Sequence, residues 1–172
     1  MPYDLDHLDE TAWRDLVARF GYRMWAVARA IGLDPADAGD AVQAAWLRLL
    51  ESRHTIRDPE RVGAWLVTTT RHEAVRVARR RAGDGPSGMP AEIAAPDADP
   101  ATMTLTDDEG RRLWAAVDTL PGPCRALVRL IVMAPDASYA QLSRRLDMPI
   151  GSIGPTRIRC LKRLRSLMKD QL

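Results

Sequence analysis

Residues 82–106 interrupt the chain near its middle with seven glycines and prolines among small and acidic residues. The stretch shows neither the 3.6-residue period of a helix nor the two-residue period of a strand. Because it offers no apolar face to bury, its composition predicts a flexible linker. The segments on either side, residues 1–81 and 107–172, are each long enough for one small domain. We therefore expect two separate cores rather than one.

The first module has the pattern of three helices. Apolar residues from position 13 to 31 recur at three- and four-residue spacing, and Gly32 is expected to end that helix. Asp34 and Pro35 predict the start of a second helix, with proline at its first position. Residues 52–58 lack any period and predict a loop, after which Pro59 opens a third helix.

The second module predicts four helices. Thr106 begins a capping-box pattern, the sequence Pro-Gly-Pro at 121–123 separates the first two helices, and Ser138 is expected to cap a short third one. The last helix runs from about Ser152, with Pro155 in its first turn. The residues expected to face inward on it are Cys160, Leu161, Leu164 and Met168. No segment predicts a strand, so the expected fold class is all-α, with two small helical domains joined by the linker.

The net charge of +2 hides an uneven distribution. Residues 1–60 carry 7 basic and 11 acidic groups, net −4, and residues 61–81 carry 6 and 1, net +5. Residues 82–110 carry 7 acidic groups and no basic one, net −7, and residues 111–172 carry 12 and 4, net +8. Two basic segments are thus separated by an acidic one, which the average conceals.

Composition argues against several classes of protein. Apolar residues make up 46% of the chain, enough for a packed core, but no apolar run approaches the ~18 residues of a membrane span. The acidic first ten residues lack the pattern of a secretory signal. Cys124 and Cys160 lie far apart without CxxC spacing, so neither a disulfide framework nor a zinc site is expected, and a reducing cytoplasm is the predicted compartment.

No constellation of catalytic residues is recognisable in the sequence. His7, His54 and His72 are scattered, and the HExxH, GxSxG and glycine-rich phosphate-loop motifs are missing. We therefore expect no enzymatic activity, no cofactor and no metal. Cys160 falls on an apolar stripe and is expected to be a small core residue.

The strongest local signal is a helix-turn-helix pattern over residues 138–163. The second helix of such a unit enters the DNA major groove with its N-terminal residues leading. With the apolar stripe turned inward, Thr156, Arg159, Lys162 and Arg163 are expected on the outer face, where they could contact bases or phosphates. The alternative is a solvated basic helix with no ligand.

A second signal is the arginine run at the end of the third helix. Arg76, Arg79 and Arg80 share one face with His72 one turn before them, and such a face could track a phosphate backbone. The alternative is a charged helix end favoured by the helix dipole. Trp65 on the same helix could stack on an unpaired base or belong to the core.

A third signal is the mixed face of the second helix. Besides Ala44, this face carries Asp37, Asp40 and Gln43, and it ends at Leu47, with Leu50 also off the core stripe. An apolar residue flanked by acids suits a protein partner. A slightly wide core stripe would explain the same pattern.

Taken together, these segments resemble a known family, the extracytoplasmic-function (ECF) sigma factors, the smallest sigma factors of bacterial RNA polymerase. The stretch DAGDAVQAAWLRL (37–49) is similar to the family's region-two helix that docks on the polymerase beta-prime clamp helices. The stretch GAWLVTTTRHEA (63–74) and the arginines behind it resemble the helix that melts and holds the −10 element. The stretches LPGPCRALVR (120–129) and SYAQLSRRLDMPIGSI (138–153) resemble region four, which reads the −35 element.

The resemblance implies partners and a source. The partners would be core RNA polymerase, through its beta-prime clamp helices and beta flap, and promoter DNA, with room for an anti-sigma factor and without membrane insertion. Residues 52–61 would form the loop that captures a flipped −10 base. The source would be actinobacterial, and with no domain after Leu172 the chain would not be one of the longer sensor-bearing members. The alternatives are a helix-turn-helix regulator or a sigma mimic that acts without core polymerase.

Residue roles follow from the same resemblance. The predicted −10 contacts are Arg53, His54, Arg57, Arg61, Trp65, Thr68, Arg71, His72, Arg76, Arg79 and Arg80. The predicted −35 contacts are Ser152, Thr156, Arg157, Arg159, Lys162 and Arg163. The predicted polymerase contacts are Asp37, Asp40, Gln43 and Leu47. The chain departs from the family at Gly154-Pro155, where a basic residue and a serine are frequent, and at Arg71-His72, where Arg-Asn is frequent.

Overall fold

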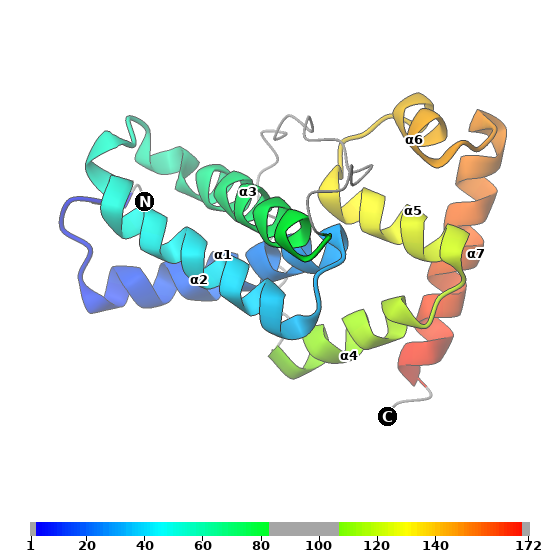
Figure 1. Ribbon diagram of the computed structural model, residues 1–172, viewed down its shortest axis with the longest axis horizontal. Helices are drawn as coiled ribbons and strands as arrows, with labels where there is room; N and C mark the ends of the chain where they lie inside the picture. Colours follow the sequence, from blue (N-terminus) through cyan, green and yellow to red (C-terminus); the bar gives the residue numbers. More distant parts are fainter. Residues whose placement is uncertain (1–2, 83–106, 170–172) are drawn as a thin grey trace. The chain divides into compact units, whose positions relative to one another are not determined.

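The computed structural model describes residues 3–82 and 107–169, and these divide between two compact units, Met1–Thr104 and Leu105–Leu172 (Figure 1). Every regular element in the described residues is a helix, which confirms the all-α prediction. Residues 83–106 contain most of the predicted linker and Thr106, and they lie outside the described part of the chain.

The first unit contains three long helices, α1 (Glu10–Ile31), α2 (Pro35–Ser52) and α3 (Val62–Ala82). The predicted stop at Gly32 is confirmed, because this residue has a φ of 111°, in the left-handed region that favours glycine. The predicted start of α2 is confirmed as well. The Asp34 side chain accepts a 2.9 Å hydrogen bond from the backbone N–H of Asp37, and Pro35 occupies the first helical position.

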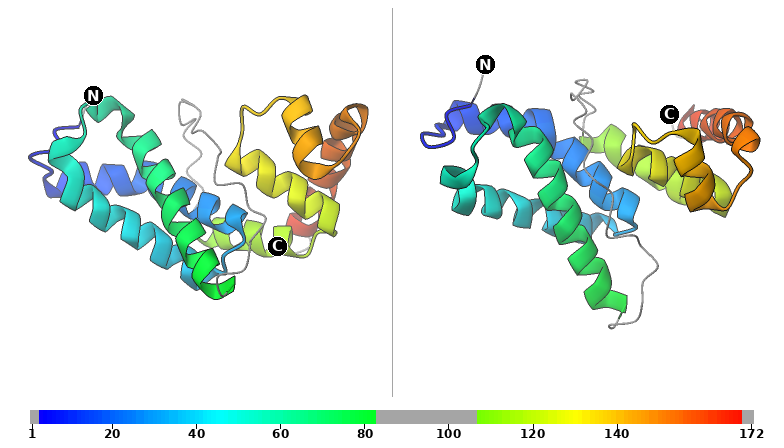
Figure 2. Two further views of the ribbon diagram at one scale, coloured as in Figure 1. Left: turned by 45° about the horizontal axis from the view of Figure 1, so that its top comes forward. Right: turned by 90° about the horizontal axis from the view of Figure 1, so that it is seen from above.

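α3 packs against both α1 and α2, which also pack against each other, and Figure 2 shows these three helices from two further sides. Leu16, Leu49 and Leu66 are completely buried there. Gly63 sits at the start of α3 directly under the ring of Phe20. A Cβ atom at position 63 would lie 2.3 Å from a ring carbon of Phe20, so only glycine allows the two helices this close approach.

The predicted loop at 52–58 contains one short turn of helix, η1 (Arg53–Thr55), and a second turn, η2 (Pro59–Arg61), leads into α3. The segment before α1 supports this loop. Leu5 is buried in the core of the unit, and the side chains of Ile56 and Tyr3 pack against the same cluster. The loop is therefore held from the amino-terminal side.

The second unit contains α4 (Asp107–Asp118), α5 (Gly122–Met133), α6 (Tyr139–Leu146) and α7 (Ile150–Lys169). α7 packs against each of the other three. The predicted cap at Ser138 is confirmed as a complete capping box with Gln141. Asp147, with a φ of 50°, ends α6 and begins the turn to α7, so α6 and α7 form the expected helix-turn-helix pair.

Two predictions about α7 are wrong. The helix begins at Ile150, so Pro155 is its sixth residue and lies beyond the first turn, where its missing N–H cannot bond to the Gly151 carbonyl. Leu161 was expected to face inward but is 45% exposed. The inward stripe instead follows Ile153, Thr156, Cys160 and Leu164, because a helix repeats every 3.6 residues.

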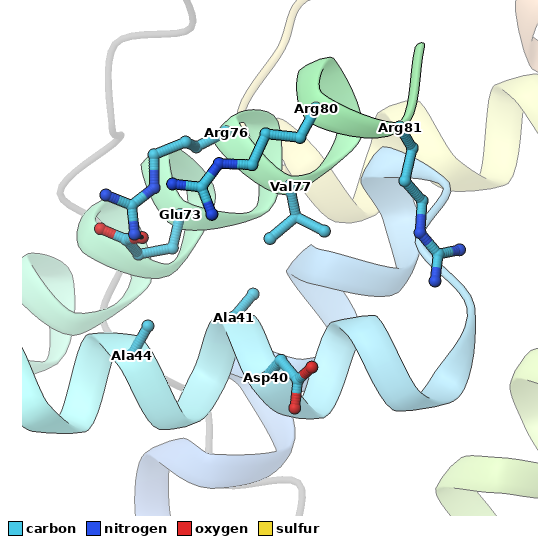
Figure 3. Close-up of a pocket in the computed structure, with 8 residues that line it drawn as sticks. All are labelled: Asp40, Ala41, Ala44, Glu73, Arg76, Val77, Arg80 and Arg81. Carbon is cyan, nitrogen blue, oxygen red and sulfur yellow. Dashed lines mark ion pairs between the residues drawn. The ribbon is translucent and has the colours of Figure 1, made fainter. Parts of the chain in front are cut away.

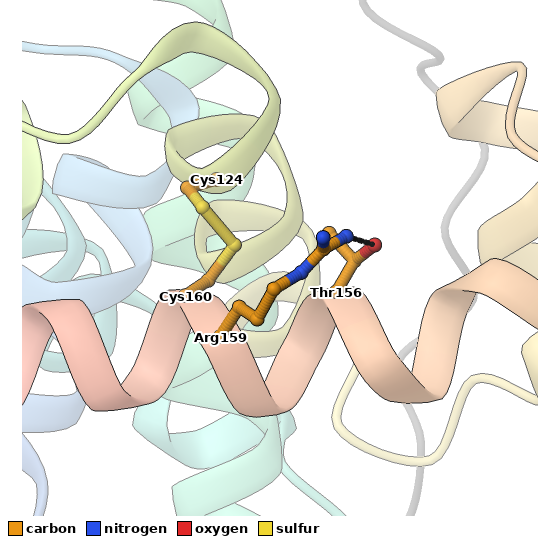
Figure 4. The surroundings of a disulfide bond; sticks show 4 residues. All are labelled: Cys124, Thr156, Arg159 and Cys160. Carbon is orange, nitrogen blue, oxygen red and sulfur yellow. Dashed lines mark hydrogen bonds between the residues drawn. A yellow bond between two sulfur atoms is a disulfide. The ribbon is translucent and has the colours of Figure 1, made fainter.

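The expectation that the cysteines stay unpaired is also wrong. Cys124 near the start of α5 and Cys160 on α7 form a disulfide, with their Cα atoms 5.2 Å apart (Figure 4). Their separation of 36 residues gave no sign of this, because the contact comes from the packing of α5 on α7. The prediction that Cys160 is a small core residue is confirmed, since it is 1% exposed.

Candidate nucleic-acid interface

The outer face of α7 carries a group of exposed cations. Arg157, Lys162 and Arg163, all predicted DNA contacts, are exposed, as is Arg165. In the described part of the chain none of the four forms an ion pair. Their charge is therefore available to an external anion, as the helix-turn-helix reading requires.

Thr156 does not lie on that face. It is 7% exposed and points into the unit, so its prediction as a DNA contact is corrected. Its hydroxyl instead accepts a 3.1 Å hydrogen bond from the guanidinium of Arg159, which stays exposed one turn further along α7 (Figure 4). Thr156 thus orients an exposed arginine rather than contacting a ligand. The hydroxyl of Ser152, a further predicted contact, donates to the Pro149 carbonyl at 2.7 Å and stabilises the start of α7.

The C-terminal half of α3 carries the second basic face. His72, Arg76, Arg79 and Arg80 are exposed, as predicted. Arg71 is only 7% exposed, so a direct DNA contact by this residue stays a prediction that its burial disfavours. Arg79 and Arg80 form no ion pair with any described residue.

Arg76 is engaged by a carboxylate that the sequence analysis did not single out. Glu73 is 4% exposed. Its carboxylate accepts a 2.6 Å hydrogen bond from Nε of Arg48, and its other oxygen lies 2.5 Å from a guanidinium nitrogen of Arg76. Glu73 and Arg76 line a groove of about 410 Å³ between α2 and α3, together with Asp40 and Arg80 (Figure 3). The one signal in the sequence was that Glu73 is the single acidic residue among six basic ones in residues 61–81.

Arg81 ties the end of α3 to the start of α2. Its guanidinium lies 2.6 Å from Asp34 and 2.6 Å from Asp37. Hydrogen bonds from the backbone N–H of Asp37 and then from Arg81 lower the pKa of the Asp34 carboxyl. Asp37 is 8% exposed and held by Arg81 within the unit, so its prediction as a partner contact is corrected.

The loop before α3 contributes further polar groups. Arg57 and Arg61 are exposed, while Arg53 is half-buried. His54 is exposed, and its Nδ1 lies 2.5 Å from the carboxylate of Asp6, which connects the loop to the amino-terminal segment. The predicted contacts in this loop thus lie on a segment that the amino-terminal residues support.

Two predicted contacts at the start of α3 are less accessible. Trp65 is half-buried and packs against the core cluster, which favours the core alternative over stacking on a base. Thr68 is half-buried as well. Direct contacts from this part of α3 would therefore be limited to the exposed edges of the two side chains.

The remaining predicted partner contacts on α2 are exposed. Asp40 and Gln43 face solvent, and Leu47 is 54% exposed, with Leu50 at 43%. The alternative of a wide core stripe is therefore wrong for both leucines. Exposed leucines on a helix that also carries exposed polar side chains are suited to a protein partner.

Within residues 3–82 and 107–169, no group of three or more histidine, cysteine or acidic side chains is placed to hold a metal ion. In the same ranges, no helix combines the length and the apolar character needed to cross a membrane.

Three comparisons with known proteins gave matches. Residues 16–83 match the family model of sigma-70 region 2. The chain is similar to the ECF RNA polymerase sigma factor SigE of Mycolicibacterium smegmatis, with 26% identity over 145 residues, 83% of this chain and 56% of the relative. It thus spans just over half the length of that relative. It is also similar to the sigma factor RpoE of Bartonella quintana, solved with the anti-sigma factor NepR, with 20% identity, a TM-score of 0.44 and coverage of 94% of this chain and 98% of that one.

Proposed function

We propose that this chain is an ECF sigma factor that binds core RNA polymerase and directs promoter-specific initiation of transcription. The observation that carries the proposal is the match of residues 16–83 to sigma-70 region 2. The match falls on the helices that hold the exposed leucines and one of the two basic faces. The similarity to a curated ECF sigma factor extends over most of the rest of the chain. The proposal places the chain in the cytoplasm, where polymerase works.

Core polymerase would bind the exposed face of α2. Asp40, Gln43 and Leu47 remain as candidate contacts, and the beta-prime clamp helices are the partner that the family resemblance names. Asp37 is left out because Arg81 holds it inside the unit. An exposed leucine between polar groups is the arrangement expected of a contact that must also tolerate water when the partner is absent.

The −10 element would be opened and held by α3 and the loop before it. Arg79 and Arg80 are the strongest candidates, because they are exposed and unpaired within the described residues. His72, Arg76, Arg57 and Arg61 add charge around them. Such a surface attracts a single strand through its phosphates, and this attraction helps to offset the cost of unstacking its bases.

The −35 element would be read by α7. Arg157, Arg159, Lys162 and Arg163 supply the cations, and the residues of α7 before Arg157, Gly154 and Pro155 among them, include no basic side chain. Phosphate contacts would then dominate over base contacts, so this helix should depend strongly on salt and weakly on sequence. An anti-sigma partner, the bounds of the linker and an actinobacterial source stay predictions.

The test is run-off transcription with core polymerase on a library of promoter sequences. We expect initiation that depends on both the chain and the core enzyme. Duplex binding by the chain alone, with no effect of polymerase, would favour a helix-turn-helix regulator instead. No DNA engagement in either case would favour a sigma mimic.

Two variants locate the polymerase contact. Leu47→Glu places a charge on the exposed face of α2 and should reduce binding to core polymerase at least ~10-fold, the usual scale for an interface anchor. Val17→Glu is the matched control, since Val17 is an apolar residue 42% exposed on α1 and is not among the predicted polymerase contacts. Equal loss from both variants would contradict the assignment.

A further inference from the structure

We propose that Cys124 and Cys160 form a reversible redox modification site, opened by a dithiol and closed by a hydroperoxide, that sets how firmly α7 is held against α5. The inference deepens the proposed function, because α7 is the helix assigned to the −35 element.

The bond encloses the turn between α6 and α7 and the leading half of α7. Cys124 is the third residue of α5, and Cys160 lies in the middle of α7. The loop that the bond closes therefore contains the rest of α5, all of α6 and the leading half of α7 (Figure 4). On α7 the bond lies one turn after Thr156, which holds Arg159, so the covalent link is adjacent to an exposed cation.

The two sulfurs differ in accessibility, and this fixes the order of events. Cys124 is half-buried at the start of a helix, whereas Cys160 is 1% exposed. A dithiol thiolate would attack the sulfur of Cys124, the Cys124–Cys160 bond would break, and the Cys160 thiolate would leave and take up a proton. The second thiol of the reagent then displaces Cys124. Two electrons and two protons pass to the cysteines, and the dithiol becomes a disulfide.

The return step uses a hydroperoxide. The Cys124 thiolate attacks the peroxide, the O–O bond breaks, and Cys124 becomes a sulfenic acid while an alcohol or water leaves. The Cys160 thiol then attacks that sulfur, the disulfide forms again, and water is released. The pair needs no resolving cysteine from another molecule, because the packing of α5 on α7 already brings the two together.

The leading half of α7 is poorly supported by its own backbone. Pro155 deprives the helix of one internal hydrogen bond, and glycines occupy positions 151 and 154. Only Ile153 and Thr156 bury side chains in this half, and beyond them the next attachment is Cys160 itself. Opening the disulfide should therefore loosen this segment before it unfolds the unit.

A reducing compartment would make this disulfide suitable for redox sensing. If the chain acts with polymerase in the cytoplasm, as proposed above, its disulfide stands in a reducing compartment. Disulfides there are uncommon and usually catalytic or redox-sensing rather than permanent. A link that holds the promoter-reading helix would connect the state of the thiol pool to transcription.

The test uses the full chain in dithiothreitol or in hydrogen peroxide, with alkylation of free thiols and hydrogen exchange read by peptide. We expect complete and reversible conversion between the bonded and the dithiol form. In the dithiol form, exchange over residues 153–165 should rise ~10-fold or more, while exchange in α1–α3 stays unchanged and the far-ultraviolet helical signal is retained. The Cys124→Ala/Cys160→Ala variant should show the faster exchange in both buffers.

Three results would overturn the inference. The first is free thiols in protein purified and kept in air, and the second is unchanged exchange over residues 153–165 after reduction. The third is loss of the helical signal of the second unit on reduction, which would show that the bond is needed for the fold itself. Run-off transcription in both buffers separates the two proposals. Equal initiation in the bonded and the dithiol form contradicts this inference. No initiation in either form contradicts the sigma-factor assignment but does not affect the hydrogen-exchange result.

Discussion

The two basic helices, α3 and α7, use their cations differently. Apolar side chains attach both helices, but α3 is also linked to α2 by ion pairs: Glu73 of α3 binds Arg48 of α2, and Arg81 of α3 binds Asp34 and Asp37. In α7 the attachment is made by apolar side chains and by the disulfide at Cys160, and the cations stay outside.

This difference separates charge that stabilises from charge that is available. Two helices with similar counts of arginine can have very different capacities for DNA, because an arginine in an ion pair must give up that partner before it can bind a phosphate. By this criterion Arg79 and Arg80 carry most of the available charge of α3, whereas nearly all the cations of α7 are available.

The largest expected effect concerns the attachment of α7. Reducing the disulfide should lower the free energy of unfolding of the second unit by about 3 to 4 kcal/mol, because the open chain regains the entropy of a 36-residue loop. The stability of the first unit, which does not contain this disulfide, should not change. Urea unfolding followed by hydrogen exchange, with and without a reductant, resolves the two units. An equal loss in both would contradict the comparison.

The next effect tests the available charge of α7. Replacing Arg157, Lys162 and Arg163 with glutamine should weaken binding to a short labelled duplex ~100-fold and reduce the salt slope of log K by about 2 to 3. Arg111→Gln, a change to an exposed cation on α4, is the control and should change neither quantity measurably. Affinity that survives the triple substitution would mean that α7 does not carry the binding.

A smaller effect is expected where charge is used internally. Glu73→Gln removes the negative charge shared by Arg48 and Arg76 and should destabilise the first unit by about 1 to 2 kcal/mol, since the hydrogen bonds to the two guanidinium groups are no longer charge-assisted on both sides. It should also strengthen duplex binding slightly, because Arg76 becomes available. Glu51→Gln removes the same charge from an exposed position on α2 and serves as the control. Weaker DNA binding in the Glu73 variant would show that Arg76 works only in its paired form.

The smallest effect is a pH dependence of stability that arises from the ion pair between Arg81, at the end of α3, and Asp34, at the start of α2. In the folded protein the pKa of the Asp34 carboxyl is lowered. The stability that the ionised carboxylate adds to the fold is therefore fully present above the ordinary carboxyl pKa of 3.8, and it is lost as the pH falls through the lower, folded-state pKa. The difference in urea midpoint between the wild type and Asp34→Asn should therefore be present at neutral pH and shrink in acid. Asp40→Asn, at an exposed site on the same helix, should show no such trend.

Much of this arrangement could be predicted from the sequence, because caps, stops and apolar spacing are local signals. Gly32, Asp34 and Ser138 marked helix ends, and Leu47 was correctly placed off the core stripe. The errors arose where position depends on packing between helices. A small polar residue such as Thr156 fits either face of a helix, and the partners of Arg71 and Asp37 are set by the tertiary fold.

The disulfide is the clearest example of that limit. Two cysteines in 172 residues suggested no framework, and nothing in their spacing could place α5 beside α7. Glu73 is a milder case, since its isolation among basic residues marked it as unusual but not as the centre of an ion-pair cluster.

The amino-terminal segment also bears on how the protein can be handled in the laboratory. Leu5 is part of the core of the first unit, and Asp6 holds His54 of the loop that precedes α3. A fragment that starts at α1 would lack both side chains, so the loop before α3 would lose this support. A version of the protein made for promoter-opening assays should therefore keep this segment.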